Sequence, residues 1–198
     1  MTTHIDRENN TSHALAPAYF GPVAWYCRLA TDPLAYINMA TPYRKQGTMN
    51  RCTIMTANGQ QTLTVPVAKP THPTALISNH GKWRQEHWNA LCTAYGDSPF
   101  FIYYEDDLRP FFEEQRWTTL FDFDSDITRK MCELLDINPP QQRYDDTAIP
   151  LDNDTGEQSF TPYYQVFQQR HGFQPNLSIL DLLFNMGPEA TGILLNEK

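Results

Sequence analysis

Long apolar runs are missing from this 198-residue chain. No stretch approaches the roughly 20 apolar residues that a membrane-spanning helix needs. The segment 1–14, MTTHIDRENNTSHA, has no apolar core of the kind found in secretory signals. We therefore expect a cytoplasmic protein with no membrane insertion. The length predicts one domain, which we place at residues 15–198 after a flexible N-terminal segment over residues 1–14.

Motifs that identify common enzyme classes are also missing. The sequence has no glycine-rich phosphate loop, no GxSxG elbow and no HExxH pair. Its four cysteines are separated by 25, 40 and 40 residues, with no CxxC pair and no Cys/His cluster at zinc spacing. We therefore expect reduced, mostly buried thiols and no metal site. No cofactor is identified.

Acidic residues are missing from one segment. Residues 33–85 contain no Asp or Glu, whereas residues 86–157 carry 17 acidic and 5 basic residues, and the net charge is −8. A surface this acidic predicts no nucleic-acid binding. The acid-free segment either binds one small anion, such as a phosphate or carboxylate of a metabolite, or neutralises the acidic segment. Its basic residues are Arg44, Lys45, Arg51, Lys69, Lys82 and Arg84.

The residue pattern predicts an α+β fold. In RCTIMTANGQQTLTVPV, two β-rich runs flank Asn58-Gly59, the favoured pair for a tight hairpin turn. Ser178 and Asp181 have the spacing of a capping box and predict a last helix that stops at Gly187. We expect a single domain with a mixed or antiparallel sheet built on the hairpin and packed by helices, with α/β as the alternative. Helices are expected over 22–30, 82–96, 105–117 and 125–136, strands over 34–39, 74–78 and 163–167, and a long connection over 141–158.

Four long motifs run along the chain. They are PAYFGP, then YRKQGTMNRCTI with GQQTLTVPV, then WRQEHWNALCTAYGDSPFF, then FQPNLSILDLLFNMGPE, and they span Pro17 to Glu189. Together they resemble the WbqC-like family of bacterial proteins. The resemblance implies a role in O-antigen and amino-sugar biosynthesis, with acyl or aminoacyl transfer onto a sugar amine as one proposed step. It therefore implies a transferase for an amino-sugar, a sugar nucleotide or another small anionic metabolite.

The chain departs from the family pattern at two places. Leu15 and Ala16 stand where many members have His-Gln, and Asn38 and Met39 stand where many have an acidic pair. Longer members also insert an α/β segment before the last motif, so this chain resembles a shortened branch. The alternative to an enzyme is a noncatalytic binding or assembly protein that keeps the family scaffold and has a protein partner.

The predicted ligand-binding residues lie in two motifs. Lys45, Asn50 and Arg51 match the family's K-x4-NR pattern inside the acid-free segment. Arginine binds a carboxylate or phosphate through two parallel hydrogen bonds, and lysine adds a mobile charge. Asn50 and Arg51 have the alternative role of fixing their loop to the backbone. Asn176, in the last motif, is not required by the helix that follows it and is a further candidate.

His87 and Cys52 are the candidate catalytic residues. His87 shares a helical face with Trp83 and Tyr95, which are the candidate substrate-binding aromatic residues. Histidine is the usual general base at neutral pH, although a histidine on an apolar stripe is more often a satisfied core residue. Cationic neighbours can lower the pKa of the Cys52 thiol, whereas alternation along the hairpin turns it toward the core.

Overall fold

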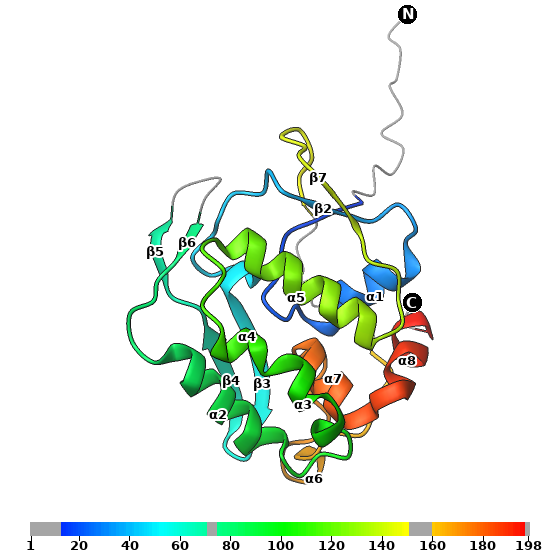
Figure 1. The fold of residues 1–198 in the computed structure, drawn as a ribbon. Helices are drawn as coiled ribbons and strands as arrows, with labels where there is room; N and C mark the ends of the chain where they lie inside the picture. The colour runs from blue at the N-terminus through cyan, green and yellow to red at the C-terminus, as the bar shows by residue number, and fades with distance from the viewer. Residues whose placement is uncertain (1–12, 71–74, 151–159, 197–198) are drawn as a thin grey trace, which may run out of the picture.

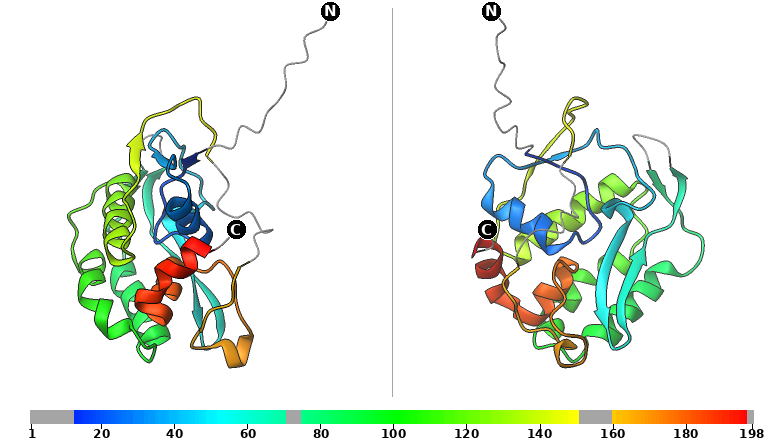
Figure 2. Two further views of the ribbon diagram at one scale, coloured as in Figure 1. Left: turned by 90° about the vertical axis from the view of Figure 1, so that its right-hand side faces the viewer. Right: turned by 180° about the vertical axis from the view of Figure 1, so that it is seen from behind.

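The computed structural model describes residues 13–70, 75–150 and 160–196. In these residues the helices form two layers, seen edge-on in Figure 2. One layer contains α2 to α5, and the other contains the β3-β4 hairpin with α1, α7 and α8 (Figures 1 and 2). The helices are α1 (Val23–Thr31), α2 (Trp83–Tyr95), α3 (Phe101–Leu108), α4 (Pro110–Glu113), α5 (Leu120–Leu134), α6 (Gln168–His171), α7 (Ile179–Met186) and α8 (Ala190–Asn196), with 3-10 turns η1 (Thr48–Asn50) and η2 (Gly187–Glu189).

The strands form three small sheets within the described ranges, which confirms the α+β class. A parallel sheet has the order β1-β2-β7, and β3-β4 and β5-β6 are antiparallel pairs. The expectation of one sheet built on the hairpin is therefore corrected, because the hairpin remains two-stranded between helices. The strands are β1 (Ala14–Leu15), β2 (Tyr36–Asn38), β3 (Arg51–Thr56), β4 (Gly59–Thr64), β5 (Val67–Pro70), β6 (Ala75–Ile77) and β7 (Gln141–Arg143).

The predicted hairpin is confirmed, with its turn one residue earlier. Thr56 pairs with Gly59, so Ala57 and Asn58 form the turn. Gly59 takes a φ of 110°, a conformation that glycine adopts without a steric penalty. The Thr56 hydroxyl accepts a hydrogen bond from the Asn58 N–H at 3.2 Å and donates one to the Gly59 carbonyl at 2.8 Å. The register therefore fixes which hairpin residues face the helices.

Several helix and strand boundaries differ from those predicted. The helix expected over 105–117 is two helices, α3 and α4, and Pro110 begins the second one at a first-turn position that does not need its missing N–H. The long connection expected over 141–158 contains strand β7, and the rest of that prediction from 151 onward lies outside the described residues. Most of the expected flexible segment 1–14 also lies outside them, although Ala14 belongs to β1.

The strand expected over 163–167 is wrong, because side chains rather than a ladder hold this segment. The Tyr163 hydroxyl donates to the buried Asp181 carboxylate at 2.8 Å. Gln165 bonds the backbone of Gln174 in both directions, at 2.8 and 2.9 Å. Asp181 is therefore turned into the core, so the predicted capping box is incomplete. Ser178 alone caps α7, accepting from the Leu180 N–H at 3.4 Å.

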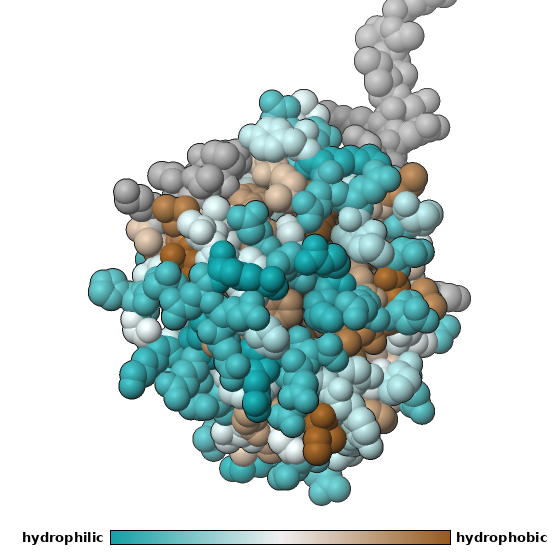
Figure 3. Space-filling view, in the orientation of Figure 1, coloured by the Kyte–Doolittle hydropathy of each residue, from teal (hydrophilic) through white to brown (hydrophobic). Residues whose placement is uncertain are grey.

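The core joins the two layers through aromatic rings of the PAYFGP segment. The Tyr19 ring stacks on Phe123 of α5 at 5.7 Å, and the Phe20 ring stacks on Phe112 of α4 at 5.8 Å. Both side chains are fully buried. The opposite face of the helical layer is mostly hydrophilic (Figure 3), as expected for the acid-rich part of the chain. The PAYFGP segment is thus a buried link between the layers.

Candidate functional site

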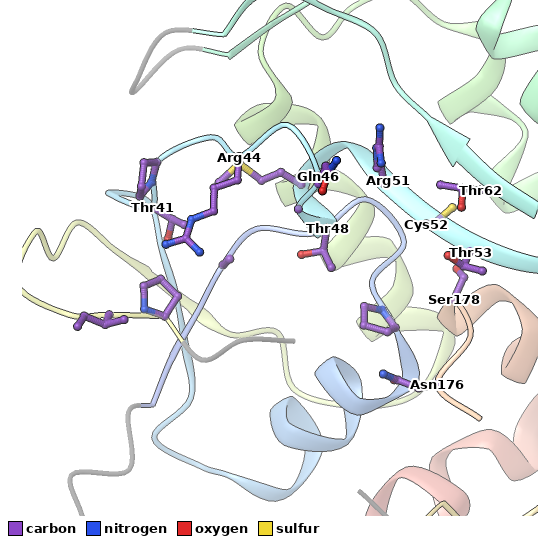
Figure 4. A pocket seen from close by; sticks show the side chains of 17 residues that line it. Thr41, Arg44, Gln46, Thr48, Arg51, Cys52, Thr53, Thr62, Asn176 and Ser178 are labelled. Carbon is purple, nitrogen blue, oxygen red and sulfur yellow. The ribbon is translucent and has the colours of Figure 1, made fainter. Parts of the chain in front are cut away.

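A cavity of about 780 Å³ opens between η1, the start of the hairpin and the last motif (Figure 4). This volume is in the range of sites that hold a metabolite or cofactor. Segments from four parts of the chain form its walls, near residues 16–22, 41–62, 149–150 and 176–178. The polar and cysteine side chains in these walls include Arg44, Gln46, Thr48, Arg51, Cys52, Asn176 and Ser178.

The cavity is electropositive. The 17 lining residues that belong to the described part of the chain include Arg44 and Arg51 and no Asp or Glu. Within the described ranges, neither arginine has a carboxylate oxygen within 4.0 Å, and the Arg51 Nε is buried without a hydrogen-bond partner. In Figure 4 the Arg44 side chain extends toward Thr41, while Arg51 lies on the hairpin side. The two guanidinium groups therefore lie in different parts of the cavity.

Asn176 lines the cavity and also caps helix α1, which is far away in sequence. Its Oδ1 accepts a hydrogen bond from the Ala24 N–H in the first turn of α1, at 2.9 Å. Pro22, the N-cap residue of α1, has no side-chain acceptor to do this. The Val23 N–H is also occupied, by the Leu177 carbonyl at 2.9 Å. The first two N–H groups of α1 are therefore occupied by protein acceptors, while no hydrogen bond within the described ranges engages the Asn176 Nδ2.

Ser178 locks three motifs together at the same wall. Its N–H donates to the Thr53 carbonyl of β3 at 2.8 Å, and its hydroxyl donates to the Phe20 carbonyl at 2.7 Å. The Ile179 N–H donates to the Gly21 carbonyl at 2.9 Å. The PAYFGP segment, the hairpin and the last motif therefore meet where the cavity forms, although more than 100 residues separate the last motif from the other two in sequence.

Lys45 and Asn50 are not among the lining residues of this cavity. Lys45 is exposed between Arg44 and Gln46, which do line it. Asn50 is 3% exposed, and its Nδ2 donates to the Val65 carbonyl at 2.8 Å. This geometry matches the alternative role of Asn50 as a residue that fixes its loop.

Cys52 lines the cavity wall but is buried. Burial raises the pKa of its thiol far above the ordinary value, and a hydrogen bond with Ser178 opposes this only in part. The thiol is therefore protonated at neutral pH, and a protonated thiol is a poor nucleophile. The adjacent cationic residue, Arg51, does not reverse the effect of burial.

His87 lies outside the cavity, one layer beneath the hairpin. The Tyr19 hydroxyl and the His87 Nδ1 are 2.9 Å apart, and burial lowers the pKa of His87 to about 4. Tyr95 is also internal, since its hydroxyl donates to Asp181 at 2.9 Å and accepts from the Met55 N–H at 3.1 Å. Trp83 lines a different and smaller cavity. The structure thus separates these three aromatic candidates from Arg51 and Asn176.

Arg44, Gln46 and Thr48 also line the cavity, although the sequence motifs did not single them out as site residues. The absence of acidic residues over 33–85 was the available signal for Arg44, whereas the motif spacing favoured its neighbour Lys45. Within the described ranges, no group of three His, Cys, Asp or Glu residues could hold a metal ion. A search of the same residues found no helix with the length and apolarity to cross a membrane.

One known protein family accounts for these motifs. The sequence pattern of the WbqC-like protein family matches residues 18–159 and 153–193, which is most of the chain. The chain belongs to the WbqC-like protein family. One relative, the "Uncharacterized protein Rv1507c" of Mycobacterium tuberculosis (strain ATCC 25618 / H37Rv), is 26% identical over 195 residues, covering 77% of this chain and 83% of the relative. No solved structure matches.

Proposed function

We propose that this WbqC-like protein binds a small anionic metabolite, such as an amino-sugar phosphate or a sugar nucleotide, in the cavity beside η1. The observation that carries this proposal is a metabolite-sized cavity with two arginines and no acidic residue among its described lining residues. Arg51 and Arg44 hold the anionic groups, and the Nδ2 of Asn176 donates a hydrogen bond to a polar group of the ligand.

The proposed reaction is transfer of an acyl or aminoacyl group onto a sugar amine, in surface-polysaccharide biosynthesis of the O-antigen type. The family resemblance supports this part, and the protein would act in the cytoplasm. The cavity residues of this chain would bind and orient the anionic substrate. Lys45, exposed at the rim, adds a mobile positive charge for it.

A noncatalytic binding or assembly protein is the second candidate. It is favoured by the state of the two candidate catalytic residues, because Cys52 is held as a thiol and His87 is internal with a pKa of about 4. In that case the protein binds the same class of ligand and presents it to a protein partner. The two candidates share the cavity and differ only in turnover.

Ligand binding is the first test. Calorimetric titration with nucleotide sugars, sugar phosphates, acyl-CoAs and amino acids should identify a ligand. Arg51→Gln should then weaken binding about 10- to 100-fold, because a charge-assisted hydrogen bond contributes roughly 1.5 to 3 kcal/mol. Arg129→Gln is the matched control, since Arg129 is exposed on α5 outside the cavity. Equal binding by wild type and Arg51→Gln would contradict the proposed site.

Turnover separates the two candidates. The identified ligand is incubated with acyl and aminoacyl donors, and products are sought by mass spectrometry. Product formation that is lost in Arg51→Gln supports the transferase. Tight binding without product, for every donor class, supports the noncatalytic candidate. No binding by any anionic metabolite would overturn both candidates.

A further inference from the structure

A second cavity, of about 250 Å³, lies at the N-terminal end of α2, beside α4. Asn79, Gly81, Lys82, Trp83 and Arg84 line it on the α2 side. It shares no lining residue with the larger cavity. The WRQEHW motif begins here, and the proposed function assigns no role to its first two residues.

Arg84 is a buried cation with no counterion among the described residues. Its side chain is 8% exposed, and its Nη1 donates to the Asn79 Oδ1 at 3.1 Å. Nε and Nη2 are buried with no hydrogen-bond partner, and within the described part of the chain no carboxylate oxygen lies within 4.0 Å of it. A guanidinium keeps its charge when buried, so an unpaired one is costly. The Trp83 ring, 4.3 Å from Cζ, offsets only part of this cost.

The first turn of α2 supplies further hydrogen-bond donors to the same cavity. Helix α2 has 13 residues, and its N-cap residue, Lys82, makes no side-chain capping bond. The first backbone N–H groups of a helix lack internal partners and carry a partial positive charge. Those of Trp83, Arg84 and Gln85 belong to residues that line the cavity. Gly81, with a φ of 78°, turns the chain into the helix just before them.

The charges around the cavity favour an anion. Lys82 is exposed at its edge, while Glu113 of α4 is the one acidic residue among the described lining residues. The Glu113 carboxylate lies 3.8 Å from the Arg109 guanidinium, which partly neutralises it. Helix N-termini combined with an arginine are a common arrangement for oxyanion binding. The small volume suits a single phosphate or carboxylate group rather than a whole nucleotide.

We propose that this cavity is a second anion site, in which Arg84, Lys82 and the first-turn N–H groups of α2 bind one oxyanion group of a metabolite. The shared chemistry is a compact oxyanion, either a phosphate or a carboxylate. The bound anion neutralises Arg84 and fills the N-terminal cap position of α2. This proposal does not depend on the ligand of the larger cavity.

The test is an NMR titration of the full-length protein with inorganic phosphate or acetate at constant ionic strength. We expect saturable shifts of the backbone amides of residues 83–85 and of the Trp83 indole. Arg84→Gln should weaken this binding at least 10-fold, and Lys82→Gln about 2- to 5-fold. Arg44→Gln, which alters the larger cavity, should leave it unchanged, as should the exposed control Arg129→Gln.

Each outcome decides the proposal. Saturation by phosphate alone identifies a phosphate site, and stronger saturation by acetate identifies a carboxylate site. Shifts that spread over the surface without saturating, or that persist unchanged in Arg84→Gln, overturn it. Loss of the shifts in Arg44→Gln also overturns it, because the anion is then in the larger cavity. Where Arg84→Gln does not fold, the Lys82→Gln variant decides. The proposal is overturned if Lys82→Gln binds phosphate or acetate with unchanged affinity and the backbone amides of residues 83–85 do not shift.

Discussion

Single side chains in this protein have been moved far from their ordinary titration behaviour by burial. Asp124 of α5 is 1% exposed, and neither of its carboxyl oxygens has a described hydrogen-bond partner. Burial without a partner raises the pKa of Asp124 well above its ordinary value. His87 shows the opposite shift for the same reason, since burial disfavours its charged form. Both residues are therefore neutral in the folded protein near neutral pH.

Asp124→Asn should remove a pH-dependent loss of stability. The unfolded chain loses the Asp124 proton near pH 4, whereas the folded chain keeps it, so wild-type stability from this residue falls as pH rises above 4. The gap between variant and wild type should grow by about 1.4 kcal/mol per pH unit up to the folded pKa. Urea denaturation from pH 4 to 7 measures it. A gap that stays constant with pH would refute a buried neutral carboxyl.

His87→Gln should remove an acid-sensitive element. The unfolded His87 binds a proton near pH 6.5 and the folded one only near pH 4, so wild-type stability falls as pH drops through this range. The loss should reach roughly 3 kcal/mol, since each pH unit contributes about 1.4 kcal/mol. The exposed His80→Gln serves as control. If His87→Gln is equally acid-sensitive, His87 is accessible to protons and regains its candidacy as a general base.

At the scale of elements, the first helix depends on a residue from the other end of the chain. Helix α1 begins after Pro22, which cannot cap it with a side chain, and Asn176 takes over this task through its Oδ1. Asn176 also has a φ of 55°, which asparagine tolerates better than alanine. The last motif therefore completes a helix that the local sequence leaves open.

Asn176→Gly and Asn176→Ala should separate the cap from the backbone conformation. Both variants lose the bond to the Ala24 N–H, which costs about 1 kcal/mol. Alanine should cost a further 1 kcal/mol or so, because its side chain disfavours a positive φ. Thermal unfolding measures the total, and hydrogen exchange of the Ala24 amide reports the cap itself. Unchanged exchange at Ala24 in both variants would show that Asn176 does not cap α1.

At the scale of the whole molecule, one buried carboxylate ties four segments together. Asp181 of α7 accepts hydrogen bonds from Tyr95 of α2, Tyr163 and Gln165, at 2.8 to 2.9 Å. Tyr95 in turn accepts from the Met55 N–H of the hairpin. Burial raises the pKa of Asp181, although its three donors oppose the shift. The network joins the two layers by polar contacts as well as by the aromatic core.

Asp181→Asn should destabilise the whole domain by about 2 to 4 kcal/mol. The amide group cannot accept from all three donors, so a buried hydroxyl or amide is left without a partner. Urea unfolding measures the effect, and the exposed Asp106→Asn should stay within about 0.5 kcal/mol of wild type. A similarly small change for Asp181→Asn would show that the network contributes little.

The features that depend on local residue patterns could be predicted from the sequence alone. The hairpin, helices α1, α2 and α7, the α+β class and the WbqC-like motifs are set by residues near one another, so turn chemistry, helical period and motif order were sufficient to predict them. Arg51, Cys52 and Asn176 were also singled out and do line one cavity.

Which of these residues share a site, and how buried and protonated each one is, depends on the tertiary structure. Burial and pairing depend on segments that are distant in sequence, so no local pattern shows that Asp181 faces the core instead of capping its helix. The same holds for His87, which is internal, and for Arg44, which takes the place at the cavity that motif spacing gave to Lys45. Charge and polarity are written in the sequence, but desolvation and distance arise only when the layers pack.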